Sequence, residues 1–206
     1  MSDPAETLVP LLTALRDLVA WLDDTQVSGM IIGGVAASLL GRPRVTRDID
    51  ALVVLDESEW ANFLAKGNAH QFLPRISDAL IFAQQARVLL VRHQTSEIDV
   101  DIAFGLFPFE REAVAHAITR EVGGIRLPLP TAEDLLVMKA IAHRPRDIVD
   151  IESILAAQPK LELRRVRRLI SGFAAVLEKP ELLRDFNALV ARQSRGKQGQ
   201  YGRPRK

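Results

Sequence analysis

Apolar residues recur at helical spacing near the start of the chain. Leucines and a valine repeat on one face between residues 8 and 22, and Asp3 and Pro4 precede them. Asp is a favoured capping residue, and Pro is preferred in the first turn of a helix. The pattern therefore predicts an amphipathic helix over residues 4–25.

The next apolar segments are short, as strands are. Met30-Ile31-Ile32 ends in Gly33-Gly34, and residues 35–40 are rich in Ala, Val and Leu, which predicts a strand, a tight turn and a short helix. A helix is also predicted over residues 108–118. Further strands are predicted over residues 49–55, 86–92 and 98–104, the last two joined as a hairpin by residues 93–97.

From residue 131 onward the apolar residues recur at helical spacing and no strand pattern is seen. A proline lies near the start of each predicted helix. The predicted helices cover residues 132–143, 145–157, 162–178 and 180–192. We therefore predict an α+β fold in which a short mixed sheet flanked by helices is followed by a helical part. The core with its N-terminal helix covers residues 1–130, the C-terminal helical part packed on it covers 131–192, and 193–206 is a disordered basic tail.

Composition narrows the classes of protein. The chain of 206 residues carries 27 Lys and Arg against 26 Asp and Glu, so it lacks the large single-sign field typical of nucleic-acid-binding proteins. It has no cysteine, which excludes disulfides and thiolate metal sites. No apolar stretch approaches the roughly 20 residues needed to cross a bilayer, so we expect a cytoplasmic protein that does not associate with membranes.

Paired carboxylates are the main candidates for chemistry. Asp48 and Asp50 open a strand two positions apart, so both side chains leave the same face and can share a hard cation. A third acid on a neighbouring strand would complete a two-metal phosphoryl-transfer site. Asp99 and Asp101 both leave one face of the strand 98–104, so either can supply it.

The double glycine at positions 33 and 34 adds a phosphate-binding element. Glycine at a strand-to-helix turn lets the backbone approach a ligand closely, and the amides at the helix start can then bind phosphate oxygens. Together, the glycines and the carboxylates that follow them predict a site for a metal-bound nucleotide.

Gly33-Gly34, then Asp48-Ile49-Asp50, then an acid between apolar residues resembles the motif set of the DNA polymerase β-like nucleotidyltransferase superfamily. Within it, the chain is similar to AbiEii-type and related minimal nucleotidyltransferases over roughly residues 28–157. That likeness rests on Lys139 and on Arg146-Asp147-Ile148-Val149-Asp150. Relatives of this kind carry Pro-Phe-Glu after the third carboxylate, as in Pro108-Phe109-Glu110, which favours Asp101.

The resemblance implies an enzyme that moves a nucleoside monophosphate from an NTP to an acceptor. Two Mg²⁺ ions, or Mn²⁺, would be held by Asp48, Asp50 and Asp101. The implied nucleotide contacts are Gly33, Gly34, Arg44, Thr46 and Lys139, with Asp147 and Asp150 in support. The acceptor stays open between tRNA, a protein and a small molecule, and a toxin role would add an antitoxin partner.

The same residues also allow structural roles and other functions. Lys139 leans toward the packed side of its helix, where it could hold a structural acid such as Asp147 or bind a nucleotide phosphate. Asp147 and Asp150 could belong to a buried brace. A non-catalytic nucleotide-binding or toxin-antitoxin-type protein of the same fold is the alternative function. The third is an RNA-binding module that uses the arginines of residues 164–168 together with the basic tail.

Overall fold

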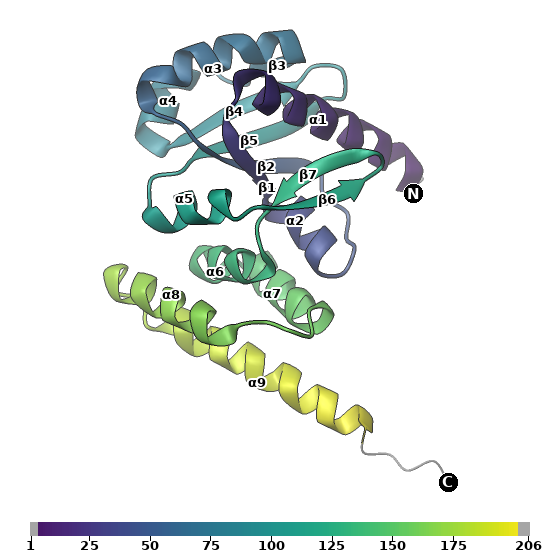
Figure 1. Ribbon diagram of the computed structural model, residues 1–206, viewed down its shortest axis with the longest axis vertical. Helices are drawn as coiled ribbons and strands as arrows, with labels where there is room; N and C mark the ends of the chain where they lie inside the picture. Colours follow the sequence, from purple (N-terminus) through teal and green to yellow (C-terminus); the bar gives the residue numbers. More distant parts are fainter. Residues whose placement is uncertain (1–3, 202–206) are drawn as a thin grey trace. The chain divides into compact units, whose positions relative to one another are not determined.

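The computed structural model describes residues 4–201, and their side chains from 8 to 194. These residues form two compact units (Figure 1). The first comprises the residues up to Ala36 together with Val45–Thr131, and the second comprises Ala37–Arg44 and the residues from Ala132 onward. The short segment 37–44 therefore belongs with the helices, although the sequence predicts it within the core.

A five-stranded mixed sheet forms the centre of the first unit. Its strands are β1 (Ser28–Ile32), β2 (Asp48–Val54), β3 (Phe72–Pro74), β4 (Val88–His93) and β5 (Ile98–Phe104). They lie in the order β1-β2-β5-β4-β3, which can be followed in Figure 1. β2 and β5 are parallel, and the other neighbours are antiparallel. This mixed sheet and its flanking helices confirm the predicted α+β fold class.

The helices of the first unit pack through aromatic residues. They are α1 (Pro4–Thr25), the start of α2 (Gly33–Leu40), α3 (Trp60–Gly67), α4 (Ala79–Ala86) and α5 (Pro108–Ala115), with 3₁₀ turns at Glu57–Glu59 and Asn68–His70. Trp21 of α1 stacks on Phe63 and Phe72, with ring centroids 4.2 and 5.2 Å apart. Its indole N–H donates to the Phe63 carbonyl at 3.1 Å. Since buried aromatic pairs contribute both area and geometry, Trp21 anchors α1 to α3 and β3.

A second, two-stranded hairpin was not predicted. β6 (Ile118–Val122) and β7 (Ile125–Leu129) are joined by Gly123 and Gly124, whose φ angles are 57° and 78°. Two consecutive positive φ angles are what the tightest hairpin turns require, and glycine supplies them. The predicted helix over 108–118 is correspondingly too long, because α5 ends at Ala115.

The start of β4 also differs from the prediction. The sequence predicts a strand from residue 86, but α4 occupies that position and β4 begins at Val88. Arg87 between them has a φ of 58° and ends the helix in the left-handed conformation. Ile81 and Phe82 of α4 are exposed, so the helix has no clear apolar stripe, and the sequence did not reveal it.

The second unit is helical, as predicted. It contains α6 (Ala132–Ala142), α7 (Pro145–Ala157), α8 (Leu163–Val176) and α9 (Glu181–Tyr201). The segment 37–44 joins these helices because the Ser153 hydroxyl accepts from the Arg42 amide at 2.6 Å and Gln158 donates to the Leu40 carbonyl at 2.7 Å. None of the helices in the described part of the chain is long and apolar enough to span a membrane.

The last helix extends beyond its predicted end. α9 continues to Tyr201, so the helix does not stop at residue 192 and the first part of the predicted disordered tail is helical. Arg, Gln and Lys, which are frequent there, are good helix formers, and glycine weakens a helix without preventing it. Residues 202–206 of that tail, and the predicted capping residue Asp3, lie outside the described residues.

Candidate active site

Four aspartates leave one face of the sheet where β2 and β5 run side by side. Asp48 lies opposite Asp99, and Asp50 lies opposite Asp101, in the parallel register of the two strands. Neighbouring strands are about 4.8 Å apart and alternate residues share a face, so the four side chains form a two-by-two array. The intervening residue Ile49 is fully buried on the opposite face. The sheet thus places all four predicted acids together.

Gly33 lies directly against Asp50. Ile32, the last residue of β1, is the antiparallel partner of Asp50, and α2 begins at the next residue. Gly33 has a φ of 59°, and a β-carbon built on it would lie only 2.7 Å from the β-carbon of Asp50. Glycine is therefore required here for two reasons, its backbone conformation and the space that the carboxylate occupies.

The start of α2 offers amide donors beside this carboxylate. Gly33 and the buried Gly34 form its first turn. The first four N–H groups of a helix have no partner within the helix, and together with the helix dipole they favour an anion. The predicted phosphate-binding turn therefore adjoins Asp50, within the first unit.

Thr46 holds the exposed Asp48 at the beginning of β2. Its hydroxyl donates to the Asp48 carboxylate at 3.0 Å, and the same hydroxyl lies 3.2 Å from the Asp48 carbonyl oxygen. This contact orients the carboxylate and ends the preceding loop. A contact between Thr46 and a phosphate stays a prediction.

Two arginines engage the acids of β5, and neither was predicted. Arg92 Nε donates to Asp99 Oδ1 at 2.6 Å, and Arg75 Nη1 lies 3.1 Å from Asp99 Oδ2. Arg75 Nη2 donates to Asp101 Oδ1. The guanidinium of Arg75 thus bridges the two carboxylates. Arg75 follows the three-residue edge strand β3, and no periodic feature of the sequence marks it.

The two acids of β5 respond to these contacts in opposite directions. The hydrogen bond from Arg92 lowers the pKa of Asp99 below that of an ordinary aspartate, with help from Arg75. Burial raises the pKa of Asp101; Arg75 opposes the rise, and the nearby charge of Asp48 adds to it. Two arginines therefore favour the ionised form of Asp99, whereas burial makes ionisation of Asp101 less favourable than that of an ordinary aspartate.

The donor set fits a hard divalent cation, although the side chains are not gathered around one. Among the described residues, no three His, Cys, Asp or Glu side chains lie close enough together to hold a metal ion. Carboxylates on one face of adjacent strands are nevertheless the ligands that Mg²⁺ and Mn²⁺ take.

Lys139 belongs to a buried ion-pair network of the second unit. Its ammonium lies 2.8 Å from Asp147 Oδ1 and 2.9 Å from Asp150 Oδ2. Arg44 donates to both oxygens of Asp150, at 2.8 and 3.0 Å. Burial would raise the pKa of Asp150, but the hydrogen bonds from Arg44 and Lys139 outweigh it and lower the pKa.

These contacts support the brace that was one interpretation of Lys139, Asp147 and Asp150. The brace also takes in Arg44, which ends the segment 37–44 and so ties it to α6 and α7. A contact between Lys139 or Arg44 and a nucleotide phosphate stays a prediction.

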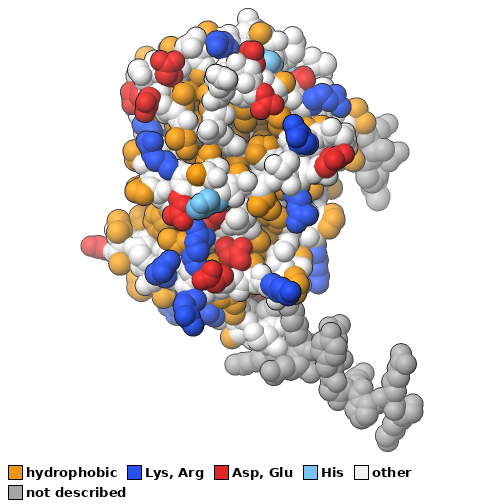
Figure 2. All heavy atoms as spheres, in the orientation of Figure 1, with side chains coloured by type: hydrophobic (Ala, Val, Ile, Leu, Met, Phe, Trp, Pro, Cys, Tyr) orange, Lys and Arg blue, Asp and Glu red, His pale blue; other side chains and the backbone are white. Residues whose placement is uncertain are grey.

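Two arginines of α8 form hydrogen bonds within the second unit. Arg165 donates to the buried Asp134 at 2.6 Å, and Arg167 donates to Asn187 at 2.8 Å. Figure 2 shows Asp and Glu side chains among the Lys and Arg side chains on the helices of this unit. This mixed charge is typical of a solvated surface and gives the RNA-binding alternative little support.

Ser96, His93 and Asp17 form a polar cluster whose composition resembles a hydrolase triad. The fully buried His93 contacts Asp17 through Nε2 at 2.9 Å and the Ser96 hydroxyl through Nδ1 at 2.7 Å. The Ser96 amide also donates to Nδ1, at 3.3 Å, so this nitrogen is an acceptor within the β4–β5 turn. We assign the cluster a structural role, joining the turn to α1.

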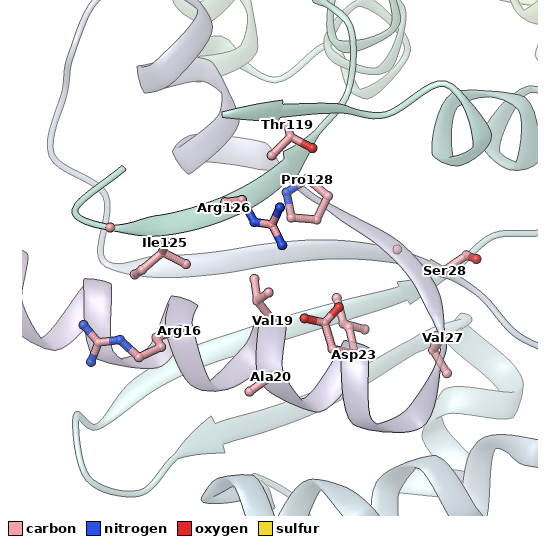
Figure 3. A pocket seen from close by; sticks show the side chains of 13 residues that line it. Arg16, Val19, Ala20, Asp23, Val27, Ser28, Thr119, Ile125, Arg126 and Pro128 are labelled. Carbon is pink, nitrogen blue, oxygen red and sulfur yellow. The ribbon is translucent and has the colours of Figure 1, made fainter. Parts of the chain in front are cut away.

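A groove of about 610 Å³ lies elsewhere in the first unit, between α1 and the β6–β7 hairpin. Figure 3 shows Asp23 of α1 and Arg126 of β7 facing one another across it. It is also lined by Ser28 and Gly29, at the end of β1 opposite Gly33. None of the predicted site residues lines this groove, so the candidate active site is the aspartate array.

One family matches the chain over nearly its whole length. The family described as nucleotidyltransferase of unknown function (DUF6036) matches residues 6–195. No curated protein matches the chain significantly.

Several solved structures share the fold. The antigenic nucleotidyltransferase-like protein from Paracoccidioides brasiliensis has a TM-score of 0.51 at 17% identity, covering 86% of this chain and 92% of that one. The antibiotic-resistance factor ANT(2'')-Ia has a TM-score of 0.55 at 17% identity, covering 83% and 95%. Its complex with adenylyl-2''-tobramycin has a TM-score of 0.54 at 18% identity, covering 81% and 98%. At these identities the likeness establishes the fold alone.

Proposed function

Because the chain belongs to the DUF6036 family of nucleotidyltransferases, we propose that it transfers a nucleoside monophosphate from an NTP to an acceptor. The observation that carries the proposal is the register that sets Asp48 and Asp50 beside Asp99 and Asp101, with Gly33 against Asp50. An acceptor oxygen attacks the α-phosphorus, the bond to pyrophosphate breaks, and the acceptor loses a proton.

The three carboxylates Asp48, Asp50 and Asp101 are assigned to two Mg²⁺ or Mn²⁺ ions. When bound, such ions neutralise triphosphate charge and make an acceptor oxygen more nucleophilic. Asp101 is also assigned to help deprotonate the acceptor. Amides at the start of α2, from Gly33 and Gly34, are assigned to phosphate oxygens.

Charged residues of the second unit are assigned to its stability. Lys139, Asp147 and Asp150 hold α6 against α7, and Arg44 holds the segment 37–44 to them. The resemblance instead implies that Lys139 and Arg44 contact a nucleotide phosphate directly. The variant Lys139→Met distinguishes a structural role of Lys139 from a phosphate contact.

A small molecule is the first acceptor to test. One structural neighbour, ANT(2'')-Ia, is found in complex with adenylyl-2''-tobramycin, and a hydroxyl of such a small molecule is chemically a suitable nucleophile. The tRNA and protein acceptors stay in the same screen. The AbiEii-type assignment and an antitoxin partner find no support in the comparisons.

The experiment supplies the purified chain with Mg²⁺ and each of the four α-labelled NTPs. Tobramycin, total RNA and lysate proteins are offered as separate acceptors. Asp50→Asn is the inactive comparison, and Asp56→Asn, an exposed acid just after β2, is the matched control. Label that moves to one acceptor pool with the wild type and Asp56→Asn, but not with Asp50→Asn, supports the proposal.

A second candidate is a non-catalytic nucleotide-binding protein of the same fold. The pairing of Arg75 with Asp101 favours it, because that pairing occupies the third carboxylate. In that case no pool takes label, while NTP binding persists. Loss of both transfer and NTP binding would remove both candidates.

A further inference from the structure

The guanidinium of Arg75 occupies the third carboxylate of the site just proposed. We propose that Arg75 is a positioning residue: it holds Asp101 while no divalent cation is bound, and it gives Asp101 up to the cation. Asp99 keeps hold of Arg75 throughout. The proposal rests on the proposed function only in taking Asp101 as a metal ligand.

The sheet itself places Arg75 beside Asp101. The backbone N–H of Arg75 donates to the Leu90 carbonyl at 3.0 Å. Leu90 is the residue of β4 that lies directly opposite Asp101 of β5. The strand register therefore places the backbone of Arg75 beside β4 at the level of Asp101, from where its side chain reaches the carboxylate.

The contacts of Asp99 show how Arg75 can release one carboxylate without leaving the site. Arg75 uses one terminal nitrogen for Asp99 and the other for Asp101. Asp99 is also bound by Arg92 at 2.6 Å, so it is well fixed. A small rotation of the guanidinium frees Asp101 and leaves the bond to Asp99 in place.

Arg75 also has an unsatisfied donor while it bridges the two carboxylates. Its Nε is buried and has no hydrogen-bond partner. A buried donor without a partner is unfavourable, so the bridging arrangement does not use the full hydrogen-bonding capacity of this side chain. A guanidinium turned toward an anionic ligand could satisfy this nitrogen.

This arrangement resolves the choice between the two acids of β5. Asp99 is the anchor of two arginines, and Asp101 is the carboxylate exchanged between Arg75 and a cation. Arg75 and a divalent ion compete for Asp101, and their charges also repel each other. Removal of Arg75 should therefore strengthen the binding of a divalent cation to the protein without nucleotide.

The test measures Mn²⁺ binding to the full chain without nucleotide, by the electron paramagnetic resonance signal of free Mn²⁺. Arg75→Gln is expected to bind Mn²⁺ about threefold more tightly than the wild type, since a partly exposed ion pair contributes only modestly. Arg92→Gln, which removes an equal charge that contacts Asp99 but not Asp101, is the matched control and is expected to change the affinity less. Asp101→Asn added to Arg75→Gln should abolish the gain.

An unchanged or weaker affinity of Arg75→Gln overturns the proposal, as does an equal gain in Arg92→Gln or Mn²⁺ binding that survives loss of Asp101. If Arg75→Gln does not fold, Arg75→Lys is used instead. Lysine keeps the charge but cannot bridge both carboxylates, so we expect Arg75→Lys to bind Mn²⁺ more tightly than the wild type. No gain in a folded Arg75→Lys then overturns the proposal. Label transfer is measured separately, so tighter Mn²⁺ binding without transfer refutes the proposed function alone.

Discussion

The α-carbon of Gly33 lies against the side chain of Asp50, so closely that a β-carbon at position 33 would be 2.7 Å from the β-carbon of the aspartate. The turn that offers amides to a phosphate and the strand that offers a carboxylate to a cation are thus in direct contact. Because the contact is between backbone and side chain, it fixes Asp50 relative to the start of α2.

Gly33→Ala should therefore impair nucleotide binding and transfer. The new methyl group must displace the Asp50 carboxylate, and it also forces Ala into a positive φ. Gly124→Ala is the matched control, since Gly124 has a φ of 78° and no atom within 4 Å of the added carbon. We expect Gly124→Ala to lower the free energy of unfolding by about 1–2 kcal/mol while NTP affinity stays unchanged. Equal NTP affinities of the two variants would argue against the role of Gly33.

Lys139→Met separates a brace from a phosphate contact. It leaves the carboxylates of Asp147 and Asp150 buried without their shared ammonium, so we expect the free energy of unfolding to fall by about 3–5 kcal/mol. NTP affinity per folded molecule should stay unchanged, which nucleotide titration measures. Lys66→Met, at an exposed lysine, should change neither quantity. A Lys139→Met protein that is stable but binds NTP poorly would support a phosphate contact instead.

Asp150→Asn should destabilise the protein in a way that depends on pH. The lowered pKa of Asp150 means that its stabilising effect is fully present above the pKa of an unfolded aspartate, about 3.9. That effect is lost as the pH falls through the lower pKa of the folded state. Urea unfolding should show Asp150→Asn about 3 kcal/mol less stable at pH 7, with the gap narrowing below about pH 4. A gap that is constant with pH would show that the charge of Asp150 is not its cause.

Asp101→Asn should have the opposite effect on stability. The raised pKa of Asp101 means that its ionised form is disfavoured by the fold, a penalty that is present above the raised pKa and disappears below about pH 3.9. We expect the variant to be more stable than wild type at pH 7 by about 0.5 kcal/mol, because the half-exposed side chain is partly screened. Unfolding curves at pH 7 and below pH 4 measure this. A less stable variant at pH 7 would mean that the pair with Arg75 outweighs burial.

Local patterns predicted much of the fold. The prolines at positions 4 and 145, each followed by apolar residues at helical spacing, predicted α1 and α7 with the bounds that the structure has. The alternation of Ile98 to Phe104 predicted β5. The β6–β7 hairpin was missed although Gly123-Gly124 between two alternating segments was a usable signal, because the helical spacing from residue 108 was extended too far.

The candidate site was predictable only as a set of acids. Spacing within one strand brings Asp48 to the same face as Asp50, and this can be read locally. The position of Arg75 cannot, because it depends on the pairing of β3 with β4 and of β4 with β5, across segments far apart in sequence. For the same reason strand spacing alone leaves Asp99 and Asp101 equivalent. The resemblance favours Asp101 through Pro108-Phe109-Glu110, and the unequal contacts with arginines distinguish the two acids further.

Initial rates of label transfer from α-labelled NTP measure whether the acids of β2 and β5 take part in nucleotidyl transfer. Asp48→Asn, Asp50→Asn and Asp101→Asn are compared with wild type and with Asp56→Asn, at equal concentrations of folded protein. We expect the rate to fall by at least about 100-fold in each of the first three variants and to stay close to wild type in Asp56→Asn. Undiminished transfer by Asp50→Asn would contradict this expectation.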